Sequence, residues 1–206
     1  MSDLIQNSAL SHRNLQDESE ALLIDMNERT DVGMIDIRGN SGDKAFMKNA
    51  AAVLGLELPT KPRTSAKKGK ITALWLSIDQ WLITMPLETR DKLLADLNKK
   101  LKKNLCLVCD VSDARTIIRL TGDEVREVLI KGCSVDVTLP EFSSGTVRRL
   151  LFAEIAALCH FVDGNPDIVD LYVFRSYANY VWEWLLQTAH EDAGVGLFKT
   201  QGMPVV

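Results

Sequence analysis

The sequence has few cysteines and no long apolar run, and these two absences exclude several classes of protein. Its 206 residues contain four cysteines, far fewer than a disulfide-stabilised scaffold needs, so we expect reduced thiols and a cytoplasmic protein. No stretch of about 18 apolar residues is free of charge, which argues against a membrane-spanning helix. The N-terminal segment lacks a basic region followed by an apolar core, so we also expect no secretory signal.

An excess of basic residues is also missing. The formal net charge is -4 and the pI is about 5.4, whereas general nucleic-acid binders are usually basic. We therefore expect neither a nucleic acid nor a membrane as a partner. With 46% hydrophobic and 25% charged residues, the composition is that of an ordinary globular protein with a sizeable core.

Motifs that would hold a nucleotide, a flavin or an acyl intermediate are absent: there is no G-x-G-x-x-G, no P-loop and no G-x-S-x-G. His12, His160 and His190 have no carboxylate or nucleophile placed beside them in a catalytic pattern. Cys106 and Cys109 form a C-x-x-C inside an apolar strand, where residues three apart face opposite sides, so we interpret them as buried structural thiols. The sequence thus predicts no catalytic, cofactor-binding or metal-binding residue.

The periodicity of apolar residues predicts an α+β protein. Strands are expected over residues 32–39, 71–77, 80–86, 105–113, 115–122 and 167–176, with two more over 145–162 separated by a kink near Ala153-Glu154. Helices are expected over 44–56, 87–104, 123–133 and 175–194, the first with Asp43 as N-cap and Gly55 as terminator. Residues 58–70 are predicted to form a loop, because they contain two prolines, a glycine and five basic residues.

The two halves of the chain share a pattern. Arg38 corresponds to Arg119, and Leu58-Pro59 to Leu139-Pro140, both at an offset of 81 residues. Each half is then roughly β-α-β-β-α-β in cyclic order; with so few identities, chance similarity is the alternative. This repeat predicts a duplicated α+β unit with helices packed on antiparallel sheets.

The same pattern sets the expected domain bounds. We predict an N-terminal arm over residues 1–30, which is either a loose tail or a segment that orders on a partner. A single α+β domain follows over 31–194, made of repeats at about 31–110 and 111–194. Residues 195–206 are predicted to be a C-terminal tail.

Basic residues gather in the expected loop, among them Arg63, Lys67 and Lys68, and again at Lys99, Lys100, Lys102 and Lys103. Both groups are typical of solvated surface, and a polyanion or an acidic partner subunit is the alternative for them.

The segment Asp110-Val-Ser-Asp113-Ala-Arg115 is interpreted as a buried turn. In this interpretation the aspartates cap backbone amides and Arg115 pairs with one of them. A role in ligand binding is the alternative.

The last expected helix is apolar around most of its circumference, so it needs two burial surfaces. One is its own sheet, and the other is either another lobe of this chain or another protein. We predict that Trp182 packs in the core and that Trp184, with Tyr177 and Tyr180, contacts a partner. The basic residues Arg63, Lys67 and Lys68 complete the predicted partner interface.

Three segments resemble the gamma subunit of heterotetrameric sarcosine oxidase: TALWLSIDQWLITMP, CDVSDARTIIRLTGDEVREVLIKGCSVDV and DLYVFRSYANYVWEWLL. The resemblance covers roughly residues 30–192. It implies a fold similar to the N-terminal folate-binding region of the glycine-cleavage aminomethyltransferase.

The resemblance also implies a function. Such a gamma chain is non-catalytic and docks on the alpha subunit of an αβγδ complex, which also contains beta and delta subunits. The complex oxidises sarcosine to glycine, passes the methyl carbon to tetrahydrofolate and reduces oxygen to hydrogen peroxide. FAD, FMN, NAD and tetrahydrofolate are expected on the partner subunits and none on this chain. The alternatives are the equivalent subunit of N-methylglutamate dehydrogenase or of a related N-methyl amine oxidase, and a stand-alone folate-binding protein.

Overall fold

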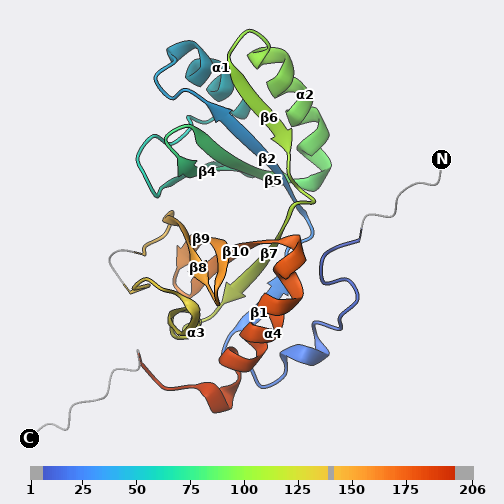
Figure 1. Ribbon diagram of the computed structural model, residues 1–206, viewed down its shortest axis with the longest axis vertical. Coiled ribbons are helices and arrows are strands. Elements are labelled where there is room, and N and C mark those ends of the chain that lie inside the picture. The colour runs from blue at the N-terminus through green and yellow to red at the C-terminus, as the bar shows by residue number, and fades with distance from the viewer. Residues whose placement is uncertain (1–6, 139–141, 198–206) are drawn as a thin grey trace, which may run out of the picture.

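The computed structural model, which describes residues 7–138 and 142–197, contains two five-stranded antiparallel sheets (Figure 1). The first sheet has the order β3-β4-β5-β2-β6, with β2 Val32–Gly39, β3 Ser65–Lys68, β4 Ile71–Ser77, β5 Gln80–Pro86 and β6 Cys106–Asp110. The second has the order β1-β7-β10-β9-β8, with β1 Asp25–Glu28, β7 Arg115–Thr121, β8 Val147–Phe152, β9 Ile155–Gly164 and β10 Asp167–Phe174.

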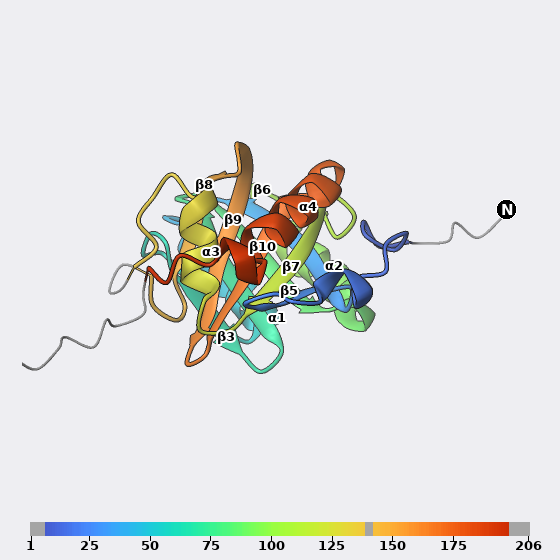
Figure 2. The same cartoon turned by 90° about the horizontal axis from the view of Figure 1, so that it is seen from below.

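Helices cover the outer face of each sheet. The helices α1 Lys44–Leu54 and α2 Arg90–Leu101 share an apolar cluster with the first sheet, and α3 Val125–Gly132 and α4 Ala178–Ala189 share one with the second. Figure 2 shows α3 and α4 lying across the second sheet. A third cluster, which includes Met34, Leu74, Ile117 and Tyr172, joins the inner faces of the two sheets. The layers therefore run helices, sheet, sheet, helices.

The strand order confirms the predicted duplication. Reading β3-β4-β5-β2-β6 beside β8-β9-β10-β7-β1 matches each strand of one sheet with one of the other. In both units a helix follows the matched strands β2 and β7, and a second helix follows β5 and β10. Each unit has one strand more than predicted, and Leu139 and Pro140 of the sequence repeat lie outside the described residues.

Local signals set the ends of α1 as expected. The Asp43 carboxylate accepts hydrogen bonds from the amides of Ala45 (2.8 Å) and Phe46 (3.1 Å), which would otherwise lack partners at the start of the helix. Gly55 ends the helix with a φ of 70°, a backbone conformation that glycine adopts without strain. Both predictions are confirmed.

The structure corrects one predicted connection between strands and describes another in more detail. The predicted loop over 58–70 contains the short strand β3, whose polar sequence Ser-Ala-Lys-Lys carries little strand signal, so this part of the prediction is wrong. The predicted kink between β8 and β9 is a two-residue turn in which Ala153 and Glu154 have positive φ values of 46° and 70°.

The N-terminal segment is part of the second half of the fold. β1 pairs with β7, and the side chain of Leu10 is 1% exposed in the cluster that also contains α4. The backbone of Leu23 donates to Ala189, at the end of α4. A loose tail is therefore wrong for residues 9–28, because their apolar side chains are buried by this chain itself.

Near its C-terminus, the chain is hydrogen-bonded to α3. The carboxylate of Glu127, which is 1% exposed, accepts hydrogen bonds from the amides of Val195 (2.6 Å) and Leu197 (2.9 Å). The rest of the predicted tail, 198–206, lies outside the described residues. Within the described residues, no helix combines the length and the apolar character needed to cross a membrane.

Candidate functional site

A polar cavity of about 680 Å³ lies where the two sheets face each other. Both sheets contribute to it: Thr72 and Thr84 belong to the first, and Arg119, His160 and Tyr172 belong to the second. It is lined by several ionisable side chains, so it is the first candidate for a ligand site.

The strand register of the second sheet places three of these side chains in one row. Asp170 on β10 lies opposite Arg119 on β7 and opposite His160 on β9. Directly paired residues share a face of a sheet, so all three point towards the first sheet. The sequence signal for this row is an aspartate and a histidine inside otherwise apolar strands, and nothing in the sequence alone connects the two.

Four of the charged side chains that line the cavity form two ion pairs. Arg119 and Asp170 form a two-point ion pair at 2.7 and 2.8 Å, and Asp170 is only 5% exposed. Arg29 holds Asp31 in the same way at 2.7 and 2.8 Å, and this hydrogen bonding lowers the pKa of Asp31 and raises the pKa of Arg29. Both pairs lie beside the cavity, the Arg119–Asp170 pair in the more buried position.

His160 and Tyr172 are uncharged at neutral pH. Burial lowers the pKa of His160 to about 4, and its Nε2 lies 3.2 Å from the Ser65 hydroxyl across the sheet interface. Burial likewise raises the pKa of Tyr172. The cavity can therefore offer hydrogen bonds to a polar molecule, but its arrangement does not activate a nucleophile.

The three basic residues of the predicted interface lie on β3 or just before it. Arg63, Lys67 and Lys68 are exposed, and Lys67 lines the cavity mouth. The carbonyl of Arg63 accepts a hydrogen bond from the amide of Val147 at 3.0 Å, which ties this segment to the start of β8.

The predicted aromatic part of the interface lies at the opposite end of β8. Tyr177 and Tyr180 are 45% and 44% exposed, and the Tyr180 hydroxyl donates to the Ala153 carbonyl at 2.9 Å. Trp184 is half-buried within the chain, and its ring packs edge-on against that of Phe152, with the two ring centroids 4.9 Å apart. The basic and aromatic groups are therefore separated by the length of β8 and form two patches, and their contact with a partner stays a prediction.

Trp182 lies in the core, as predicted, with no exposed surface. The second burial surface of α4 is the N-terminal segment of this chain, because Leu15, Leu22 and Leu23 pack on the same cluster. The amphipathic pattern showed that a second surface was needed, but it could not show which segment supplied it.

The cysteines differ from expectation on β6. Cys109 is exposed and Cys106 is half-buried, so the interpretation of both as buried thiols is wrong. The reason is that β6 is an edge strand of the first sheet, with one neighbour only. Cys159 is fully buried, where its contact with Cys133 and the loss of solvent raise the pKa of its thiol. No group of three or more His, Cys, Asp or Glu that could hold a metal occurs among the described residues.

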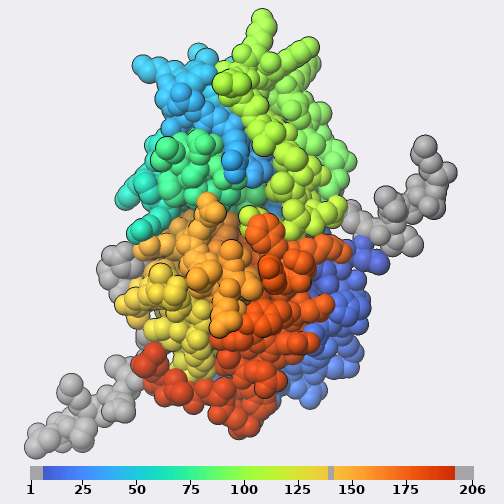
Figure 3. All heavy atoms as spheres, in the orientation of Figure 1, coloured from blue at the N-terminus to red at the C-terminus, as the bar shows by residue number. Residues whose placement is uncertain are grey.

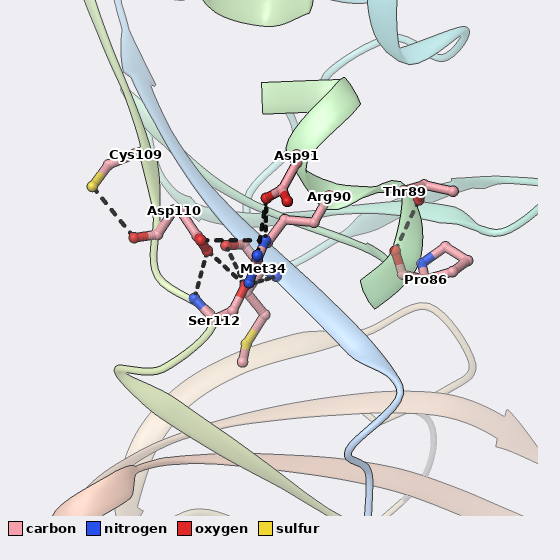
Figure 4. A network of polar contacts seen from close by, with 8 residues as sticks. All are labelled: Met34, Pro86, Thr89, Arg90, Asp91, Cys109, Asp110 and Ser112. Atoms are coloured by element: carbon pink, nitrogen blue, oxygen red, sulfur yellow. Dashed lines mark hydrogen bonds and ion pairs between the residues drawn. The ribbon is translucent and has the colours of Figure 1, made fainter. Parts of the chain in front are cut away.

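A polar network surrounds the turn after β6, where the Ser112 hydroxyl accepts a hydrogen bond from the Met34 amide of β2 at 2.9 Å (Figure 4). The Asp110 carboxylate accepts hydrogen bonds from the Ser112 amide at 2.9 Å and the Ser112 hydroxyl at 2.6 Å, which confirms the predicted capping for this aspartate. Asp110 and Asp113 are both exposed, so the prediction that the turn is buried is wrong. The cation paired with Asp110 is Arg90 at 3.3 Å, whereas Arg115 lies over the ring of Phe174 at 4.5 Å. Arg115 therefore does not pair with Asp110, because Arg90, at the start of α2, reaches this carboxylate instead.

A family sequence model, that of the sarcosine oxidase gamma subunit family, matches residues 38–191, which include most of both sheets. The chain belongs to this family. The family predicted from the three sequence segments is thereby confirmed. A comparison with curated protein sequences finds no match.

Solved structures confirm the fold of this gamma-family chain. A chain of the heterotetrameric sarcosine oxidase from Corynebacterium sp. U-96, in complex with pyrrole 2-carboxylate, superimposes with a TM-score of 0.83 at 21% identity, over 93% of this chain and 98% of that chain. The glycine cleavage system aminomethyltransferase T from Bartonella henselae matches with a TM-score of 0.62 at 14% identity, over 84% of this chain. The match spans 48% of the aminomethyltransferase, or about half its length.

Proposed function

We propose that this chain is the non-catalytic gamma subunit of a sarcosine oxidase complex and docks on a larger, flavin-bearing alpha subunit. The family match over both sheets carries the proposal. The cavity supports it, because Arg119 and Asp170 are paired with each other and His160 is uncharged at neutral pH. This chain then contributes shape and contacts, and the chemistry belongs to its partners.

The complex so formed would oxidise sarcosine to glycine, transfer the one-carbon unit to tetrahydrofolate and produce hydrogen peroxide in the cytoplasm. FAD, FMN, NAD and tetrahydrofolate would reside on the alpha, beta and delta subunits. Purification through a tagged copy of this chain tests the proposal: a yellow complex that consumes oxygen with sarcosine is expected. Turnover of N-methylglutamate in place of sarcosine would assign the chain to the related dehydrogenase instead.

A stand-alone folate-binding role is the second candidate, and the cavity between the sheets favours it together with the aminomethyltransferase-like fold. Titration of the isolated chain with tetrahydrofolate separates the two candidates. The subunit role predicts no saturable binding by the isolated chain, whereas stoichiometric binding would favour the second candidate.

A further inference from the structure

Exposed apolar side chains lie on the edge strand β6 and at the adjoining end of the first sheet. Leu105 is 98% exposed, Ile78 76% and Leu107 52%, although each is a large hydrophobic residue. The three line one groove of about 410 Å³ between β6 and the turn that joins β4 to β5. In the space-filling view β6 and the turn before it lie uncovered on the face turned to the viewer (Figure 3).

The strand β6 differs from the other three edge strands. β1 carries Asp25 and Glu28, β3 carries Lys67 and Lys68, and β8 carries Arg148 and Arg149, and such charges protect an edge from further pairing. β6 reads Cys-Leu-Val-Cys-Asp, with its first charge at the last position. It is therefore the one apolar edge in the part of the chain that the structure describes.

Two of the other edges also carry hydrogen bonds to neighbouring segments. β3 is joined to the second sheet by the hydrogen bonds from Ser65 to Gly145 and from Val147 to Arg63. β1, which holds the position of β6 in the duplicated unit, is held to the N-terminal segment through a side chain, because the Glu28 carboxylate accepts hydrogen bonds from the amides of Ala9 and Leu10. Across the described ranges, β6 pairs with β2 alone. Its outward amides and carbonyls form a ready template for another strand.

The charge around this edge indicates what kind of strand would fit. Residues 97–109 contain no acidic side chain, and they include four exposed lysines, Lys99, Lys100, Lys102 and Lys103. This segment is strongly positive in a chain whose net charge is -4. A partner segment with acidic residues beside its apolar ones would be attracted to this edge.

We infer that β6 is a docking edge for the alpha subunit, which adds an extended segment of alternating apolar and acidic residues as a sixth strand of the first sheet. The inference rests on the proposed function and names the surface that function would use. Apolar side chains of the added strand would lie beside Leu105 and Leu107. Acidic side chains of the segment would lie against the four lysines.

A matched pair of variants tests the surface. Leu107→Lys places a charge on the β6 edge, and Leu151→Lys does the same on β8, where Leu151 is 54% exposed. Each variant is co-expressed with the alpha subunit, and the affinity of the complex and the melting temperature of the free chain are measured. We expect Leu107→Lys to weaken association by more than about 10-fold and Leu151→Lys to leave it unchanged, with both chains folded.

Two further measurements distinguish an added strand from a loose contact. The double variant Lys102→Glu/Lys103→Glu should weaken association and reduce its dependence on salt. Cys109, exposed on β6, should react with iodoacetamide in the free chain and be protected in the complex, together with slowed hydrogen exchange over 105–110.

The outcomes separate this inference from the proposed function. If the wild-type chain forms no complex with the alpha subunit, both are overturned. If Leu107→Lys binds the alpha subunit as tightly as the wild-type chain does, only the docking edge is overturned. If Leu151→Lys alone prevents assembly, the interface lies at β8 instead. The wild-type chain could also form a homodimer. If Leu107→Lys dissociates that homodimer and does not change binding to the alpha subunit, the edge is assigned to a second copy of this chain.

Discussion

Trp182 donates its indole N–H to the carboxylate of Glu18 at 2.9 Å, which bonds the last helix directly to the N-terminal segment. Glu18 also accepts from Arg13 at 2.8 Å, and Arg13 reaches Glu183 on α4 at 3.0 Å. The hydrogen bond from Arg13 and that from Trp182 lower the pKa of Glu18. The N-terminal segment is thus integrated with α4 by both apolar packing and a polar network.

Replacing Trp182 by alanine should destabilise the free chain strongly. The side chain is fully buried, and truncation of a buried tryptophan costs about 3–5 kcal/mol through lost contacts and a cavity. Unfolding in denaturant measures the loss. Tyr177→Ala is the control, because Tyr177 is 45% exposed, and it should change stability by less than about 1 kcal/mol. Similar losses in the two variants would contradict the placement of Trp182 in the core.

The stability of the chain should fall between about pH 6.5 and pH 4 because of His160. Its pKa is about 4 in the folded chain and close to 6.5 when unfolded, so the unfolded state binds more protons in this window. Acidification therefore favours unfolding, by on the order of 3 kcal/mol over the window. Unfolding free energies measured at several pH values should show a smaller loss for His160→Gln. Parallel curves for the two chains would refute the burial of His160 as a neutral group.

The Arg119–Asp170 pair should show strong coupling. Removing Arg119 alone (Arg119→Leu) leaves the nearly buried Asp170 carboxylate without its cation and should cost about 3 kcal/mol. The double variant Arg119→Leu/Asp170→Leu should lose less than the sum of the two single changes. A double-mutant cycle on unfolding free energies gives the coupling directly. Strict additivity would show that the two side chains do not depend on each other.

The isolated chain should bind no flavin. The sequence contains no dinucleotide fingerprint, and the proposed function places the flavins on the partner subunits. Visible absorbance of the purified single chain, after incubation with FAD or FMN and removal of free cofactor, provides the measurement. Stoichiometric flavin bound to the single chain would contradict the proposal that only the partner subunits bind flavin.

Strong local patterns were predictable from the sequence. The hairpin β4–β5 has the predicted bounds, because apolar residues fill both strands and Ile78-Asp79 marks the turn. Asp43 and Gly55 set the ends of α1 as their chemistry requires. The duplicated topology was also predictable, because the two halves of the sequence share a pattern even though few residues are identical between them.

Features that depend on non-local contacts were not predictable in the same way. The strands β1 and β3 are short and polar, and each exists because a long apolar neighbour pairs with it. Cys109 is exposed because β6 lies at an edge, and strand order is not encoded in the residues of one strand. The cavity joins residues of both sheets, so its row of Arg119, Asp170 and His160 becomes visible only once the register is known.

The composition of the complex tests the central claim most directly. Native mass spectrometry of the assembly purified through a tagged copy of this chain should show one copy of it bound with three other subunits of different mass and their flavins. Recovery of the chain alone, or only with copies of itself, would contradict its role as the gamma subunit of a heterotetrameric oxidase.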